Sequence, residues 1–384
     1  MKIGIITYWS SEDNYGQQLQ CFALQRYLRN LGHDAFLIRY IYTYKASILT
    51  KILSRFSVSF WKNRTKRHEE FKLYRVNHIL NQKRKFKEFR QEYLQMSNEL
   101  YTNIRQLQQN PPKADLYITG SDQVWHNPIH DRNAEAFYLN FGPKNIKRMS
   151  YAASIGRKIA PNEARKFKSL VNKLDYISVR ELDAEKTCHD LGIEKAVVTI
   201  DPTFLLPLQE YTKLYNKQDI VYPSYIFLYL INIDSLESIC WSNITKYAKE
   251  ENLQIQHVMS SGYLPARELI PDSKNIQASI PEWLTLINNA SCIITTSFHA
   301  VVFAILHHKQ FLAIPLKGVY AKANNRIITL LESLNLSERI YNESLSFAQQ
   351  MNNPINWNLV ESKLSEIRIS SINFLNQCLD NQEQ

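Results

Sequence analysis

Short apolar runs alternate with stretches of helical period along the first half of the chain. Apolar runs fall at 3–7, 35–40, 114–119, 148–154, 176–179 and 197–200, and helical patterns fall at 17–30, 162–174 and 184–191. Short apolar strands separated by helices of this length are typical of a parallel sheet with helices on both faces. The pattern therefore predicts one α/β domain.

The same alternation restarts in the second half, after a segment at 211–223 that has no clear period. Strands are predicted at 225–231, 254–259, 292–295 and 311–315, and helices at 236–250, 281–289, 298–308, 326–334 and 359–379. We therefore expect two doubly wound Rossmann-like domains facing a cleft. They occupy residues 1–207 and 208–345, and a helical segment at 346–384 is expected to pack back on the first domain.

Composition excludes several classes of protein without changing this picture. With 45% hydrophobic and 21% charged residues, the 384-residue chain is globular rather than disordered. Its nine glycines form no G-x-G-x-x-G or P-loop pattern, which excludes classical dinucleotide binding and P-loop chemistry. The five cysteines are far apart and never form a C-x-x-C pair, so we expect reduced, buried thiols and no metal site.

The opening segment and the apolar runs of the chain favour a cytoplasmic protein. The opening MKIGIITYWS has one lysine and a short apolar run, which indicates a first strand rather than a signal peptide. The longest nearly uncharged run, Ala290–Leu306, contains Ser, Thr and His and is short for a membrane span. We therefore expect no transmembrane helix.

The net charge of +10 is concentrated in one stretch. Residues 45–92 contain fourteen Lys/Arg against four Glu, and the rest of the chain is balanced at 32 of each sign. Apolar residues recur at helical spacing between the basic ones: Ile48, Ile52, Leu53, Phe56, Phe60 and Trp61. The pattern predicts a basic helical insert within 45–108, suited either to an anionic membrane surface or to packing on its own domain. With no recognised nucleic-acid motif beside the charge, we expect no nucleic-acid partner.

Candidate chemistry lies at the carboxyl ends of the predicted strands, where open α/β sheets bind ligands. Thr296, Ser297 and His299 follow one strand and open a helix, whose N-terminus favours an anion. His299 can transfer a proton near neutral pH. Arg180 and Glu181 follow another strand. Arg180 can bind phosphate or carboxylate through two N–H groups, or form an ion pair with Glu181.

Other strand ends add further candidates. Asp122 and Gln123 follow the strand at 114–119, and Asp122 can accept hydrogen bonds from sugar hydroxyls, act as a base or simply stabilise a turn. Arg326 precedes a predicted helix and is a second candidate for anion binding. Asn14 and Ser154 complete the set of polar residues at strand ends.

Six segments in order resemble the polysaccharide pyruvyl transferase family. They are N-Y-G-Q-Q-L-Q at Asn14–Gln20, Y-I-T-G-S-D-Q-V-W at Tyr117–Trp125, Y-A-A-S-I-G at Tyr151–Gly156, I-S-V-R-E at Ile177–Glu181, D-P-T-F-L-L at Asp201–Leu206 and T-S-F-H-A at Thr296–Ala300. The resemblance runs to about residue 335. It implies a GT-B-like fold and transfer of pyruvate from phosphoenolpyruvate to a sugar of a surface-polysaccharide precursor, as a ketal, with release of phosphate.

The resemblance also implies roles for single residues. Arg180 is similar to the donor-binding arginine of the family, and His299 to its catalytic histidine. Some members have an arginine two residues before that histidine, where this chain has Ser297, and Arg326 is our candidate replacement. We expect Thr296 and Ser297 to help bind the donor, and Asp122 to orient or deprotonate the acceptor hydroxyl.

Asn14, Gln123, Ser154 and Glu181 are then expected to line the cleft or to bind the acceptor sugar. Phosphoenolpyruvate is the co-substrate, and no other cofactor is expected. The basic insert suggests an acceptor carried on a lipid. Two alternatives stay open: a GT-B glycosyltransferase that uses a nucleotide sugar, and a sugar-binding protein without catalytic activity.

Overall fold

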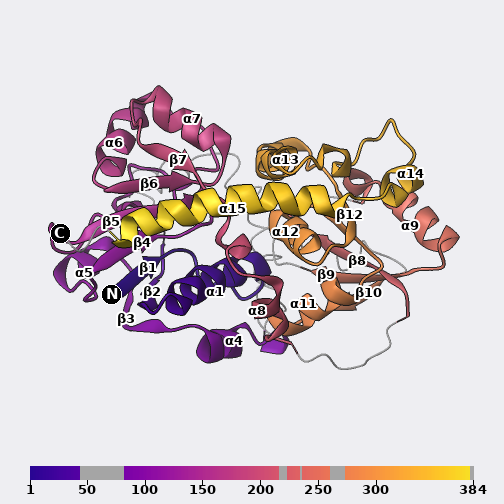
Figure 1. Cartoon of the computed structure of the whole chain (residues 1–384), viewed down its shortest axis with the longest axis horizontal. Helices are drawn as coiled ribbons and strands as arrows, with labels where there is room; N and C mark the ends of the chain where they lie inside the picture. Colours follow the sequence, from indigo (N-terminus) through magenta and orange to yellow (C-terminus); the bar gives the residue numbers. More distant parts are fainter. Residues whose placement is uncertain (44–81, 216–222, 234–235, 260–272, 381–384) are drawn as a thin grey trace, which may run out of the picture.

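The computed structural model describes residues 1–43, 82–215, 223–233, 236–259 and 273–380. These residues form two parallel sheets, one with the strand order β3-β2-β1-β4-β5-β6-β7 and one with the order β10-β9-β8-β11-β12 (Figure 1). In both sheets the chain first winds outward on one side of the first strand and then on the other, as in Rossmann-like domains. The predicted fold class, two doubly wound domains in a GT-B-like arrangement, is confirmed.

The central strands of the first sheet are buried on both faces because helices cover both (Figure 1). The strands are β1 (Lys2–Ile6), β2 (Asp34–Tyr40), β3 (Met96–Tyr101), β4 (Leu116–Thr119), β5 (Lys147–Ala153), β6 (Tyr176–Val179) and β7 (Ala196–Val198). The helices are α1 (Tyr15–Asn30), α4 (Phe86–Tyr93), α5 (Ile104–Gln109), α6 (Pro161–Val171) and α7 (Leu182–Asp190), with short 3₁₀ segments at Arg132–Tyr138 and Pro202–Phe204. Burial on both faces explains why the central strands are apolar runs without alternation.

The second sheet is smaller and follows the same plan. Its strands are β8 (Tyr225–Leu230), β9 (Gln254–Met259), β10 (Lys274–Ile276), β11 (Cys292–Thr295) and β12 (Gln310–Ala313). The helices of this half are α8 (Leu208–Thr212), α9 (Trp241–Glu250), α11 (Ile280–Asn289), α12 (Phe298–Leu306), α13 (Asn324–Ser333), α14 (Phe347–Asn352) and α15 (Trp357–Asp380). Among the described residues, no helix is both long and apolar enough to cross a bilayer.

One segment of the first domain differs from the sequence prediction. The sequence predicts a helical insert over 45–108, but β3 lies within it and pairs in parallel with β2 at the edge of the sheet. An edge strand has one unpaired side, and three central residues of β3 are exposed, so its sequence MSNELY carries no apolar run. Residues 44–81, with most of the predicted basic helix, lie outside the described residues.

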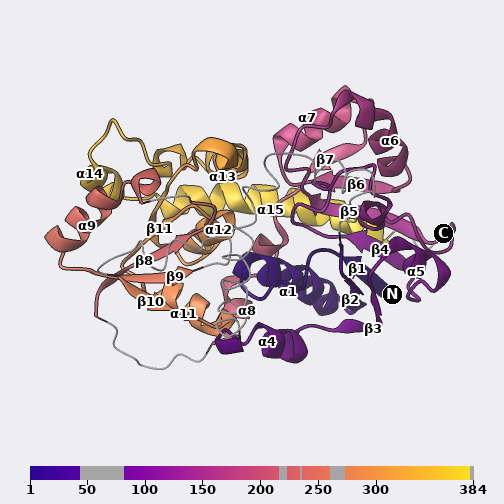
Figure 2. The ribbon, with the colours of Figure 1, turned by 180° about the vertical axis from the view of Figure 1, so that it is seen from behind.

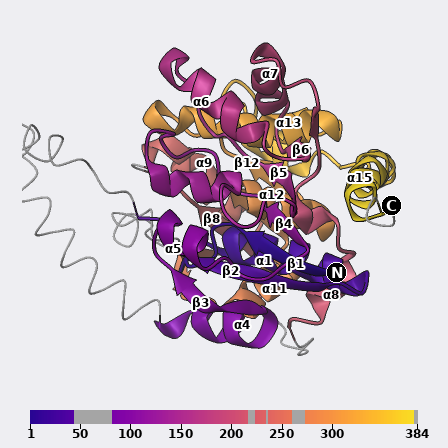
Figure 3. The same ribbon diagram turned by 90° about the vertical axis from the view of Figure 1, so that its left-hand side faces the viewer.

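Helix α15 contacts both domains. Near its start, Glu361 accepts a hydrogen bond from His308, which follows α12. Farther along, Arg368 donates to the carbonyl of Phe204, and Ser371 accepts from the backbone N–H of Ile200 in the first domain. Figures 1 and 2 show the helix running across the two sheets, and Figure 3 shows it on the outside of both. The last helix therefore joins the domains along one flank.

A second junction between the domains is apolar. The ring of Tyr15 in α1 stacks on Trp283 in α11, with ring centroids 5.3 Å apart, and its hydroxyl donates to the carbonyl of Ala278. Buried apolar side chains continue without a break from β1 and α1 into α11 and α12. Burial of this kind is the main favourable contribution to folding, so the two domains share part of one core.

Two buried histidines should make stability depend on pH. Burial lowers the pKa of His257 and of His307 to about 4, although hydrogen bonds with Asn275 and with the carbonyl of Phe303 oppose the shift. An unfolded chain binds these protons near pH 6.5, so the free energy of unfolding should fall as pH drops from about 6.5 toward 4. Between pH 7 and pH 5 each histidine should contribute a loss of about 2 kcal/mol.

Urea unfolding of the wild type and of His257→Gln at both pH values measures this effect. The variant should lose less stability on acidification than the wild type. An equal loss in the two proteins would contradict the prediction for His257.

Candidate functional site

The start of helix α12 places His299. Ser297 caps this helix, because its Oγ accepts a hydrogen bond from the backbone N–H of Ala300, and its own N–H donates to Oγ1 of Thr295. His299 therefore lies in the first turn, where it is buried with its ring edge-to-face against Phe298. Because the short β11–α12 turn is held by hydrogen bonds at both ends, the imidazole has a defined direction.

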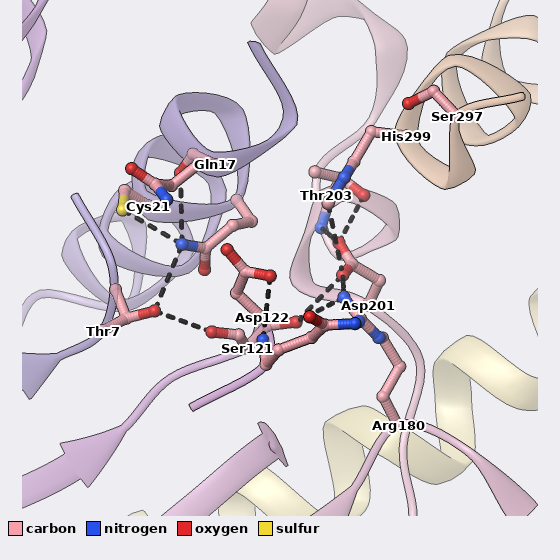
Figure 4. Close-up of polar contacts among 12 residues, drawn as sticks. Thr7, Gln17, Cys21, Ser121, Asp122, Arg180, Asp201, Thr203, Ser297 and His299 are labelled. Carbon is pink, nitrogen blue, oxygen red and sulfur yellow. Dashed lines mark hydrogen bonds and ion pairs between the residues drawn. The ribbon is translucent and has the colours of Figure 1, made fainter. Parts of the chain in front are cut away.

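Asp201 lies at the centre of a buried polar cluster. It follows β7, and its Oδ1 accepts from the N–H and the hydroxyl of Thr203 at 3.0 and 2.6 Å. Its Oδ2 accepts from the hydroxyl of Ser121 at 2.9 Å and from Nη1 of Arg180 at 3.1 Å. Nε2 of His299 lies 3.6 Å from the same oxygen. Figure 4 shows His299 pointing from α12 toward Asp201 and Thr203, and Arg180 reaching the same carboxylate.

The surroundings of Asp201 keep it ionised. Burial alone raises the pKa of a carboxyl group. Here the nearby imidazole of His299, the charge of Arg180 and the hydrogen bond from Thr203 together hold the pKa of Asp201 well below its usual range. Asp201 is therefore a fixed negative charge between a guanidinium and an imidazole.

Arg180 is enclosed but keeps one N–H edge free. Its Nε donates to Glu181 at 3.0 Å, and its guanidinium lies over the ring of Phe298, 4.7 Å from the centroid. Burial lowers the pKa of Arg180, but the charges of Glu181, Asp201 and Asp122 outweigh burial and raise it. Within the described residues, Nη2 of this arginine has no hydrogen-bond partner. A buried N–H group without a partner is rare in folded proteins, and a guanidinium N–H is a strong donor to anions.

Arg326 is a second cation near the first. It lies in the first turn of α13, and its Nε is enclosed without a partner among the described residues. Burial and the positive charge of Arg180 lower the pKa of Arg326, although the charge of Glu181 opposes them. Asn325 donates to Asp183 at the start of α7, which ties α13 to the first domain. An anion bound between the two guanidinium groups would relieve their repulsion.

Asp122 and Ser154 occupy adjoining strand ends. Asp122 has φ 80°, and this left-handed backbone is held because its carbonyl accepts from the N–H of Ser154 at 3.0 Å. One carboxylate oxygen accepts from the N–H of Gln123 at 2.8 Å. Ser154 is buried, and its hydroxyl has no partner in the described part of the chain. Strained backbone of this kind persists where surrounding contacts hold it, and it is frequent at functional sites.

Two other predicted residues form structural hydrogen bonds. Oδ1 of Asn14 accepts from the N–H of Gln17 and caps α1. Oγ1 of Thr296 donates to the carbonyl of Ile231 at 2.8 Å and accepts from its N–H at 2.7 Å, which joins the loops after β8 and β11. The structure thus brings His299 and Arg180 together at Asp201, and Glu181 pairs with Arg180. The hydrogen bonds of Asn14 and Thr296 serve the start of α1 and the loops of the second domain instead.

Sequence reasoning missed Asp201 and Gly16 as site residues. Asp201 follows a predicted strand, so the strand-end rule that selected Arg180 could have found it. Gly16, in the first turn of α1, lies against the ring of His299: a Cβ placed on Gly16 would be 2.1 Å from its Nδ1. This contact joins residues far apart in the chain, and no local pattern signals it.

Two hollows lie at the carboxyl end of the second sheet, and their linings do not include Asp201, Arg180 or His299. A cavity of about 20 Å³, room for about one water molecule, is lined in part by Thr296. A hollow of about 570 Å³ shares Ser238, Pro315 and Lys317 with it and extends to Tyr341. Space of this size is typical of small-molecule sites. Of the candidate site residues, Thr296 lines the small cavity, and the larger hollow lies farther out in the second domain.

Two doubly wound domains with a buried Arg–carboxylate–His cluster at their junction define the class: a GT-B-like α/β protein. The chain belongs to the polysaccharide pyruvyl transferase family, because a model of that family matches residues 14–318. The match includes Asn14, Asp122, Arg180 and His299, and ends before Arg326. The family assignment makes the protein a transferase and confirms the resemblance of its six motifs.

Solved structures give only distant similarity. The UDP-GlcNAc 2-epimerase of Methanocaldococcus jannaschii is 12% identical, with 97% of this chain and 92% of that chain covered and a TM-score of 0.48. UGT89C1 of Arabidopsis thaliana, solved with UDP-L-rhamnose, is 9% identical, with 99% of this chain and 98% of that chain covered and a TM-score of 0.48. Comparison with curated proteins gives no match.

Proposed function

We propose that the protein transfers pyruvate from phosphoenolpyruvate to two hydroxyls of a saccharide, forming a ketal and releasing phosphate. The observation that carries this proposal is the buried Nη2 of Arg180, which has no hydrogen-bond partner in the described part of the chain and lies near His299 and Arg326 in a member of this family. Phosphoenolpyruvate carries a carboxylate and a phosphate on a small enol. Two guanidinium groups suit two anionic groups through charge-assisted hydrogen bonds.

The donor site combines three kinds of contact. Arg180 and Arg326 bind the two anionic groups. Ser297 uses a lone pair of its oxygen to cap α12, so its O–H remains to donate to an anion at the helix N-terminus. Thr296 uses its only hydroxyl proton in the bond to Ile231, so it supports the loop rather than donating to the donor.

Ketal formation needs one proton delivered to carbon and two taken from hydroxyls. His299 gives a proton to the methylene carbon, which becomes the methyl group. One sugar hydroxyl then adds to the adjacent carbon and loses its proton. The C–O bond to phosphate breaks, and the second hydroxyl adds at the same carbon and loses its proton. One of the two protons restores His299 and the other leaves with phosphate, while Asp122 orients the attacking hydroxyl.

Phosphate release from phosphoenolpyruvate in the presence of a lipid-linked oligosaccharide pool tests the function. Release that depends on the acceptor supports pyruvyl transfer. Thermal shifts with phosphoenolpyruvate and with UDP-GlcNAc accompany the assay, so that a missing acceptor is not mistaken for a wrong donor. Stabilisation by the nucleotide sugar and not by phosphoenolpyruvate would replace this proposal with a glycosyltransferase.

Replacing Arg326 should separate ligand binding from stability. Because its Nε has no partner among the residues that the structure describes and Arg180 repels it, Arg326→Met should keep or raise the melting temperature. The same change should weaken phosphoenolpyruvate binding about tenfold or more, because a hydrogen bond to a charged group contributes about 1.5–3 kcal/mol. Calorimetric titration and thermal unfolding measure the two effects. Unchanged affinity would remove Arg326 from the donor site.

The acceptor is proposed to be a sugar carried on a lipid at the cytoplasmic face of the membrane. Support comes from the sequence alone, which concentrates the basic excess between residues 45 and 92. Deleting residues 47–67 should weaken binding to vesicles rich in anionic lipid without abolishing phosphoenolpyruvate binding. Equal vesicle binding by the deleted and full chains would end the membrane proposal.

A further inference from the structure

Asp201 contacts both functional groups of the proposed site from one oxygen. Its Oδ2 accepts from Nη1 of Arg180 at 3.1 Å and lies 3.6 Å from Nε2 of His299. Arg180 and His299 belong to different domains: Arg180 follows β6 in the first, and His299 lies in α12 of the second. Asp201 thus links the donor-binding group to the proton-transferring group across the domain junction.

The position of the Asp201 carboxylate is itself determined by its surroundings. Oδ1 is held by the N–H and hydroxyl of Thr203, and Ser121 donates to Oδ2 from the end of β4. Only 2% of the surface of Asp201 is exposed. The chain directly after it forms a 3₁₀ turn that begins at Pro202. A carboxylate held on both oxygens cannot swing toward a ligand, so it acts through its neighbours.

The imidazole of His299 is confined on its other side as well. Gly16 of α1 approaches so closely that a Cβ there would lie 2.1 Å from Nδ1. The ring therefore lies between the backbone of α1 and the carboxylate of Asp201. The helix limits where the ring can go, and the negative charge attracts the ring when it is protonated.

We propose that Asp201 is a positioning residue: it orients the imidazole of His299 and fixes it relative to Arg180, without contacting the substrate. This inference deepens the proposed function and rests on it for its kinetic part. Arg180 does not depend on Asp201 alone for its placement, because its Nε also donates to Glu181 at 3.0 Å. Loss of the Asp201 charge should therefore affect His299 more than Arg180.

The charge of Asp201 should have opposite effects on donor binding and on turnover. A fixed negative charge beside Arg180 opposes binding of an anionic donor, since like charges repel. The same carboxylate lies 3.6 Å from Nε2 of His299 and orients the imidazole that must give a proton to the methylene carbon. Removing the charge should therefore keep or tighten phosphoenolpyruvate binding while slowing the reaction.

Asp201→Asn is the test, because asparagine has the same size and its amide oxygen can still accept from Thr203. We expect kcat to fall about tenfold or more, but no further than in His299→Ala, because general acid–base catalysis contributes about 10²–10⁴-fold. The dissociation constant for phosphoenolpyruvate should stay equal or decrease. Asp201→Asn combined with His299→Ala should be no slower than His299→Ala alone, because both changes then act on one group.

A second readout does not depend on the reaction. The ring ¹⁵N signals of His299 in the wild type, assigned by their absence in His299→Ala, should move in Asp201→Asn. Signals of His257 and His307, which have other partners, should not move. Unchanged His299 signals would overturn the proposal, as would a parallel loss of kcat, donor affinity and melting temperature, which indicates a purely structural role. If the wild type neither binds nor consumes phosphoenolpyruvate, the proposed function fails, and the ring signals still decide whether Asp201 positions His299.

Discussion

Replacing His299 with alanine should lower acceptor-dependent phosphate release by about 100-fold or more. The imidazole is the proposed source of the proton that phosphoenolpyruvate needs at its methylene carbon, and such proton transfer contributes about 10²–10⁴-fold to rates. Arg180 and Arg326 are untouched by the change, so donor affinity should stay within a few-fold of the wild type. Initial rates at saturating donor, together with a titration of donor binding, separate the two quantities.

His308→Ala is the matched control for His299→Ala. His308 is also close to α12, but it is half exposed and pairs with Glu361 on α15 rather than with Asp201. The control variant should retain wild-type turnover. Near wild-type activity in His299→Ala would remove the histidine from the mechanism, whatever its place in the structure.

Gly16→Ala should cost nearly as much activity as the loss of the imidazole itself. The added Cβ would lie 2.1 Å from Nδ1 of His299, far inside van der Waals contact, so the ring must move away from Asp201. Alanine favours helices over glycine by about 0.5–1 kcal/mol, so the loss would not come from a weaker α1. We expect turnover to fall about 100-fold and the melting temperature to fall with it.

The double variant distinguishes displacement of the ring from a general disturbance of α1. If Gly16→Ala acts by moving the imidazole, adding it to His299→Ala should cause no further loss of turnover. The double variant should also recover part of the lost melting temperature, because the clash with the ring is gone, although the Cβ of residue 299 remains close at 2.7 Å. If the two changes instead lower turnover by independent factors that multiply, Gly16 affects activity through something other than its contact with His299.

The central strands could be predicted from the sequence because both faces of each strand are covered. Strands β8 and β11 are buried at every residue, so each is an unbroken apolar run. The edge strands β3 and β10 were missed for the opposite reason. In β10, two of the three residues are exposed, and the segment KNI has no apolar pattern to detect. Such a strand forms because it pairs with a neighbouring strand, and its own sequence does not show which segment that neighbour is.

The site shows the same limit. Arg180 and His299 were found because each follows an apolar strand, and strand ends of parallel sheets meet at one edge. Asp201 and Gly16 matter through contacts between segments far apart in the chain, which periodicity cannot show. Arg326 was found for its charge. Its closeness to Arg180 is a property of the fold alone, and so is the burial of its Nε, which finds no partner among the described residues.

Helix α15 has a consequence for how the protein is made. Its buried residues Leu364, Leu375 and Cys378 belong to the same apolar core as the first sheet, and Ser371 supplies an acceptor for Ile200. Chains fold from the N-terminus as they are synthesised, and the first domain emerges long before α15 does. During translation, the apolar surface of the first domain that α15 later covers is therefore exposed to solvent. Nascent or prematurely terminated chains should be targets for chaperones and prone to aggregate, even though their first sheet is complete.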